Sequence, residues 1–137
     1  MTSSQMRAAL LTGMQNLTLG SFQVSTELPW DAAGTALYEK NPKVFYVSEP
    51  DVEESQVFAV MNGDTFVDRT TTIQVYVQVD AKQQPTNYDD LMDAVQNLRL
   101  LSTLTAIRTR ECDVVATFEA DAMITEFEFR FTELKIN

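Results

Sequence analysis

The chain has 137 residues, of which 45% are hydrophobic, and it contains only 4 glycines and 4 prolines. This composition predicts a single folded domain over residues 1–137, large enough to bury a core. The formal net charge of −10 argues against surface binding of DNA or RNA, because phosphate contacts need a concentrated lysine and arginine face. The same charge discourages contact with anionic membranes, and no apolar run approaches the roughly 20 residues that cross a bilayer.

The residue types needed for most enzyme chemistry are missing. There is no histidine, which removes the usual general base and metal ligand. Cys112 is the single cysteine and lies in the strand-like segment ECDVVATF, so we interpret it as a core residue rather than a nucleophile. No glycine-rich phosphate loop exists. We therefore expect a protein that is not an enzyme and has no catalytic, cofactor-binding or metal site.

The N-terminal segment has the apolar spacing of a helix. Apolar and small residues recur at helical intervals and predict a helix from Ser4 to Leu17, with Ser3 or Ser4 as its cap. Gly20 is placed to end this segment, and a short strand is predicted over Ser21–Val24.

Residues 26–42 are irregular and contain the only tryptophan, Trp30. We interpret Trp30 as a plug over the edge of the core, with an interface anchor as the alternative, because interfaces also favour this residue.

Next come a strand and an acidic run. Lys43–Val47 is apolar on both faces and predicts a strand inside a sheet. Four carboxylates then follow within six residues, and they are Glu49, Asp51, Glu53 and Glu54. They could form a cation site, but the ligand spacing and glycine of an EF-hand loop are missing. We therefore predict a solvated acidic loop.

A hairpin with one long arm dominates the middle of the sequence. Asn62–Gly63 is a strong turn signal after a strand predicted over Gln56–Met61, and Asp64 and Asp68 are interpreted as turn and edge residues. The run TTTIQVYVQV alternates strictly, which predicts a half-buried strand. The apolar face should point inward, and it consists of Ile73, Val75, Val77 and Val79. The polar face should be free, and it consists of Thr72, Gln74, Tyr76 and Gln78.

The last third predicts a helix and a second hairpin. The stripe Tyr88, Leu91, Met92, Val95 and Leu98 indicates a helix ending between Arg99 and Leu104, with aspartates in its first turns. Two strands follow. One face of the first carries Cys112, Val114, Ala116 and Phe118, and one face of the second carries Met123, Phe127, Phe129 and Phe131. The phenylalanines are interpreted as core rather than base-stacking residues, because no basic groove accompanies them. The tail TELKIN is out of phase with them, which predicts a bulge or a departure from the sheet.

These elements together predict an α+β fold, with a mostly antiparallel β-sheet of about 4–6 strands and two helices packed on one face.

The order of elements resembles a known family. A helix opening with Met6-Arg7-Ala8-Ala9-Leu10-Leu11 precedes an irregular stretch and the strand Asn41-Pro42-Lys43-Val44-Phe45-Tyr46-Val47. The acidic run, the paired strands ending in Thr72-Ile73-Gln74-Val75-Tyr76-Val77 and the helix Tyr88-Asp89-Asp90-Leu91-Met92-Asp93-Ala94-Val95 follow. Across nearly the whole chain this layout is similar to the tail terminator proteins, and related minor tail and tail-completion proteins, of long-tailed bacteriophages.

The resemblance implies a virion structural protein at the head-proximal end of the tail, assembled in the host bacterial cytoplasm. Such a protein forms a ring, hexameric in that family, which caps the tail tube, stops its polymerisation and presents a surface to the head-completion or connector protein. DNA passes through the ring without sequence-specific binding, and an acidic lining would repel it.

The interaction residues implied are those that the core does not need. They are the Trp30 loop, the acidic residues Glu49, Asp51, Glu53 and Glu54, and the hairpin tip Asn62, Gly63 and Asp64.

Two other classes stay open. One is another head–tail connector, neck or baseplate component with the same order of elements. The other is a small-ligand-binding α+β domain, unrelated to phages, that uses the sheet face as a pocket.

Overall fold

Two long antiparallel strands, β5 (Asp64–Asp80) and β7 (Ala122–Ile136), run through the whole molecule. The two strands pair from Phe66 opposite Ile136 to Asp80 opposite Ala122. This computed structural model describes residues 1–18, 22–25, 43–55, 59–61, 63–80, 82, 87–104, 107–119 and 122–136. β-branched and aromatic residues alternate with polar ones along both strands, which suits a pleated, half-buried surface. The long alternating strand predicted from the sequence is confirmed.

The other strands attach to this pair. The sheet has the order β1-β2-β5-β7-β6, where β1 is Gln23–Ser25, β2 is Lys43–Val47 and β6 is Thr109–Glu119. Two further strands, β3 (Asp51–Glu54) and β4 (Ala59–Met61), pair with β5 beyond the end of β2, so that β2, β3 and β4 follow one another along the same side of β5. Apart from the parallel β1–β2 pair, the described ladders are antiparallel.

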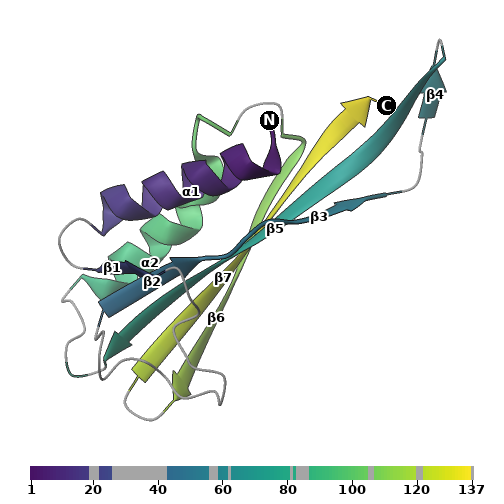
Figure 1. Ribbon diagram of the computed structural model, residues 1–137. Helices are drawn as coiled ribbons and strands as arrows, with labels where there is room; N and C mark the ends of the chain where they lie inside the picture. The colour runs from purple at the N-terminus through teal and green to yellow at the C-terminus, as the bar shows by residue number, and fades with distance from the viewer. Residues whose placement is uncertain are drawn as a thin grey trace.

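Both helices lie on one face of the sheet, as Figure 1 shows, so the predicted α+β fold is confirmed. They are α1 (Ser3–Leu17) and α2 (Tyr88–Gln96), and the 3-10 turn η3 (Asn97–Leu100) continues α2. The predicted cap of α1 is wrong by one or two residues. Thr2 caps it, because only Thr2 is followed three residues later by a glutamine, and Gln5 completes a reciprocal capping box with it.

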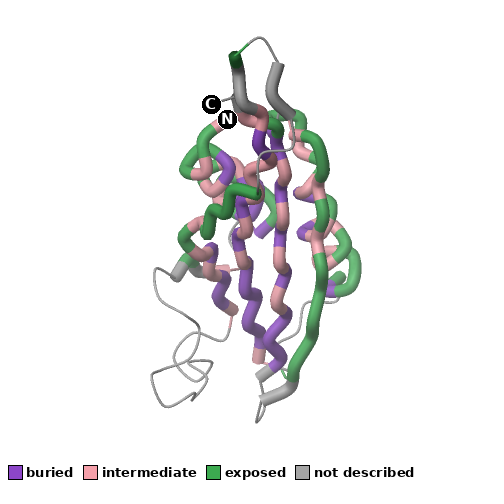
Figure 2. Tube along the Cα trace, turned by 90° about the vertical axis from the view of Figure 1, so that its right-hand side faces the viewer, coloured by how far each residue is buried: buried purple, intermediate pink, exposed green. Residues whose placement is uncertain are grey.

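The core lies between the helices and the sheet, and buried residues alternate along its central strands in Figure 2. The inward series of β5, namely Ile73, Val75, Val77 and Val79, is fully buried, as predicted. Phe127, Phe129 and Phe131 of β7 are also fully buried, which confirms their interpretation as core residues. Gly13 lets α1 approach η3, since a Cβ there would lie 2.8 Å from a methyl carbon of Leu98.

The opposite face of β5 is less open than predicted. Thr72 and Gln74 are only partly exposed, whereas Gln78 is fully buried and Tyr76 is 8% exposed. The Tyr76 ring packs against Tyr46 of β2, with ring centroids 6.0 Å apart, and its hydroxyl donates to Gln74 at 2.8 Å. The end of this face that lies beside β2 is therefore buried, and the residues on either side of Gln78, Val44 and Ile124, are no more than 5% exposed.

The predicted bulge in the C-terminal tail is also wrong, because β7 stays in register with β5 as far as Ile136. The tail seemed out of phase because a charged residue, Glu133, occupies the next inward position after Phe131. Glu133 is 5% exposed and is neutralised by Arg69, which lies directly opposite on β5 and also donates to the carbonyl oxygen of Met1.

We predict that Arg69→Met lowers the free energy of unfolding by about 3 kcal/mol, because it leaves the Glu133 carboxylate buried without its main partner. Combining it with Glu133→Met should recover most of this loss, since two apolar residues replace the pair. Urea unfolding of the single and double variants measures both values. A double variant less stable than Arg69→Met would contradict this account.

Candidate functional site

The face of the sheet opposite the helices gathers carboxylates from four strands. Residues directly opposite each other on paired strands share a face, so the register places them on the side of Thr72 and Gln74. Eight carboxylates and two guanidiniums lie on this surface, which we call the acidic face. The carboxylates are Asp51, Glu53, Asp68, Asp80, Glu111, Asp113, Glu126 and Glu128, and the guanidiniums are those of Arg108 and Arg130.

Arg130 is the centre of the charge network on β6 and β7. Its guanidinium donates to Asp113 at 2.7 Å, to Glu128 at 3.0 Å and to Glu111 at 3.2 Å. The hydrogen bonds that Arg130 donates to Asp113, Glu128 and Glu111, largest effect first, raise the pKa of Arg130. One cation thus serves three carboxylates, and the cluster stays negative. The group is exposed enough for salt to screen it, so its contribution to stability is small.

The other guanidinium, that of Arg108, also binds a carboxylate. Arg108 binds Asp68 through both carboxylate oxygens, at 2.7 and 2.8 Å. Nearer β2, burial raises the pKa of Tyr76, and the negative charge of Glu126 raises it further. The acidic face therefore favours cations and protonated groups over anions.

The acidic run is not the loop that its composition predicted. Asp51–Glu54 forms β3, which pairs with residues 69–72 of β5, and all four residues are exposed. Pairing with a strong neighbouring strand overrides the weak strand propensity of aspartate and glutamate. Glu54 binds Lys135 of β7 at 2.6 Å, whereas Asp51 and Glu53 form no ion pair with any described residue. In the described ranges no three metal-binding side chains lie close enough to hold an ion.

Glu49 belongs to a separate contact that ties α1 to the sheet. Its carboxylate lies 3.8 Å from the Arg7 guanidinium, which donates to the carbonyl oxygens of Val47 and Ser48 at 3.0 and 2.9 Å. Glu49 itself is exposed, so it adds to the negative surface at the start of β3.

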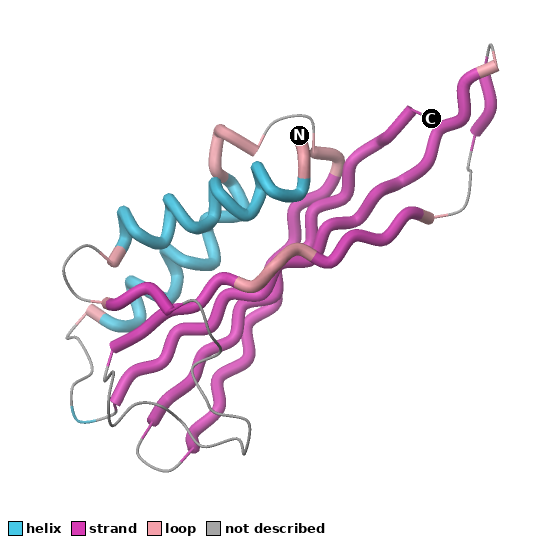
Figure 3. The backbone as a smooth tube through the Cα atoms, viewed as in Figure 1, coloured by secondary structure: helices cyan, strands magenta, loops and turns pink. Residues whose placement is uncertain are grey.

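The predicted hairpin is confirmed at its tip. Met61 of β4 pairs with Asp64 of β5, and Gly63 between them has a φ of +83°, which a glycine adopts without strain. Figures 1 and 3 show that this hairpin extends beyond the end of the helix layer, and we call residues 59–69 with 133–136 the arm. Asn62 and Trp30 lie outside the described residues.

The structure thus divides the predicted interaction residues between β3 and the tip of the arm. It also brings together the carboxylates of β6 and β7, which the sequence had not indicated as a site. In the sequence, Glu126, Glu128 and Arg130 alternate with the phenylalanines of β7. What the sequence did not reveal was the register with β6 that brings Glu111 and Asp113 beside them.

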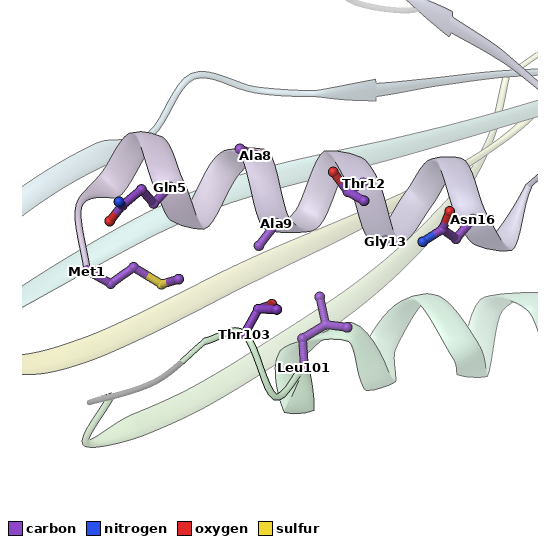
Figure 4. Close-up of a pocket in the computed structure, with 9 residues that line it drawn as sticks. All are labelled: Met1, Gln5, Ala8, Ala9, Thr12, Gly13, Asn16, Leu101 and Thr103. Atoms are coloured by element: carbon purple, nitrogen blue, oxygen red, sulfur yellow. The ribbon is translucent and has the colours of Figure 1, made fainter.

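A separate hollow of about 380 Å³ lies between α1 and the segment after η3 (Figure 4). Its lining includes Ala9, Gly13, Leu101 and Thr103, with Gln5 and Asn16 toward the ends of the helix. The volume is at the lower limit of small-molecule sites. None of the lining side chains is charged, so the hollow offers little to orient a polar ligand. The small-ligand hypothesis had placed a pocket on the sheet instead.

None of the described helices is both long and apolar enough to span a membrane.

No protein-family model and no curated protein matches this chain. Among solved structures it is similar to a chain of "Virion of native gene transfer agent (GTA) particle", with 14% sequence identity, coverage of 94% of each chain and a TM-score of 0.49. At this identity and TM-score the likeness carries no argument about the function of the chain.

Cys112 lies half-buried on β6 against the core, and this burial raises the pKa of its thiol to about 12. Because only the thiolate reacts, we predict that native protein at pH 8 is alkylated by iodoacetamide some two to three orders of magnitude more slowly than unfolded protein. The native rate should rise about tenfold per pH unit below pH 12, as the thiolate fraction does. Equal native and unfolded rates at pH 8, measured by mass spectrometry, would contradict the burial.

Proposed function

We propose that this protein is a structural subunit of a phage-like virion, of the tail terminator type. Copies associate into a ring, hexameric as the family resemblance implies, at the head-proximal end of the tail. The ring caps the tail tube, stops its polymerisation and presents a surface to the head-completion protein. This assignment gives the protein no catalytic role.

The acidic face is the observation that supports this proposal best. A ring that DNA crosses needs a wall to which phosphates do not adhere, and a surface with eight carboxylates against two guanidiniums repels them. In the proposed ring this face lines the opening, and the helices lie on the outside.

The arm and β3 are the proposed contacts with neighbouring subunits and the tube. The tip of the arm extends past the helices, so a partner can reach both of its faces. β3 carries Asp51 and Glu53, which form no ion pair with any described residue, together with Val52, which is 42% exposed. Trp30 and Asn62 remain candidates from the sequence alone.

We predict that particles assembled without this protein have tails of excessive and variable length, because nothing stops the addition of tube subunits. Electron microscopy of tails from a deletion strain measures this length, and complementation with the intact gene is the control. Tails of normal length that lack heads would instead indicate a head–tail connector, the alternative role within the virion.

Charge reversal on β3 tests its proposed role as a contact. The change Asp51→Lys with Glu53→Lys should abolish ring formation or capping, because it reverses two exposed carboxylates at the contact that form no ion pair with any described residue. Asp89→Lys with Asp90→Lys is the matched control, since it makes the same charge change on exposed residues of α2. Ring mass and tail length are the readouts. Unchanged values in the β3 variant would remove β3 from the contact.

A further inference from the structure

The sheet of an isolated subunit ends in two outer strands of unequal length. At one end is β1, with three residues, and at the other is β6, with eleven residues from Thr109 to Glu119. No described strand pairs with the outer side of β6. Its backbone therefore presents a row of N–H and C=O groups that a further strand could bind.

The outer strand β6 lacks the features that normally prevent such pairing. It contains no proline, glycine or lysine and pairs with β7 residue by residue from Thr109 to Glu119 without a bulge. Val115 on the acidic face is 59% exposed, and Val114 on the opposite face is 41% exposed. Figure 2 shows that this strand is almost wholly exposed at the edge of the sheet.

The charges on β6 do not block its outer side. Glu111 and Asp113 bind Arg130, which belongs to β7 and so lies on the inner side of the strand. The four residues that follow, Val114 to Thr117, are uncharged and exposed. This uncharged stretch can accept a strand without burying an unpaired charge.

We propose that β6 is the seam of the ring, where it pairs with the β1 end of the sheet in a second copy of this chain. This inference rests on the proposed ring, because closed heterologous association requires each copy to use two different surfaces. A sheet with the order β1-β2-β5-β7-β6 offers its two ends for that purpose. The resulting sheet closes on itself through β1 and β6.

Charge selects β1 rather than β3 as the strand that β6 meets. On β3, Asp51 and Glu53 would face Glu111 and Asp113 of the other copy, and four carboxylates would repel one another. β1 has the uncharged sequence QVS, and Val24 in it is 47% exposed. Pairing β1 with Val115–Thr117 puts Val24 opposite Ala116 on the helix side of the sheet, so both acidic faces stay on one side and exposed valines on both copies are covered.

The strand directions also agree with this seam. β1 is parallel to β2, and the ladders from β2 through β5 and β7 to β6 are all antiparallel, so β6 runs opposite to β1. If the ring axis runs roughly along the strands, the rotation from one copy to the next changes neither the direction of the strands nor the face of the sheet that points to the axis. The copies then meet as an antiparallel pair, and every acidic face lies on the same side of the closed sheet.

The experiment compares Val115→Glu with Leu100→Glu by mass in solution and hydrogen exchange. Both side chains are 59% exposed in the subunit, so each change adds the same charge at equal exposure and should leave the thermal midpoint nearly unchanged. We expect Val115→Glu to raise the concentration for half-assembly more than about tenfold, because it buries an unpaired charge in the seam. Leu100→Glu should assemble like the wild type, and residues 109–119 should gain amide protection only in assembled protein.

The possible outcomes distinguish a failure of the proposed seam from a failure of the proposed ring. Rings of the Val115→Glu variant at wild-type concentrations, without added protection in β6, would overturn the seam and leave the proposed function standing. A wild-type protein that stays monomeric even with tail-tube protein would overturn the proposed function itself. A wild-type dimer that does not grow would show β6 pairing with itself, and would overturn the heterologous seam.

Discussion

The pairing of β5 with β7 is the constraint on which the rest of the molecule depends. β2, β3 and β4 pair with the side of β5 away from β7, and β6 pairs with the side of β7 away from β5. The remaining described strand, β1, joins the sheet through β2. The helices cover the face on which the apolar residues of this pair alternate. A slip of one residue between the two strands would move their phenylalanines and valines to the acidic side, so burial and register enforce each other.

The same pair also determines where the covered sheet ends and the arm begins. The inward positions of β5 change from Ile73 to Thr71 and then to Arg69, and those of β7 change from Phe131 to Glu133. Thr71 is fully buried, and its hydroxyl has no hydrogen-bonding partner among the described residues. Apolar, polar and charged residues thus follow one another where the helix layer ends. Backbone pairing holds the arm together with three ion pairs, those of Arg69 with Glu133, Arg108 with Asp68 and Lys135 with Glu54.

What the sequence predicted well depends on local periodicity. Alternation identified β5, and helical spacing located α1 and α2, because burial imposes these patterns within a single segment. What it missed depends on contacts between segments. β3 is a strand only because β5 accepts it, and the tail appeared irregular because Glu133, its inward residue, is charged. The carboxylates of β6 and β7 form one surface through their register, which no single segment reveals.

The acidity of this surface is not required by the fold. Thr72 and Gln74 occupy the same face without charge and pair equally well in the sheet, so uncharged polar residues at Glu111, Asp113, Glu126 and Glu128 would satisfy the same strands. Like charges on neighbouring strands repel, and one arginine offsets only part of that repulsion. A surface that costs some stability and adds nothing to the core is best explained by what it faces. In the ring proposed above that neighbour is DNA, a polyanion, and repulsion between the two would keep the passage free.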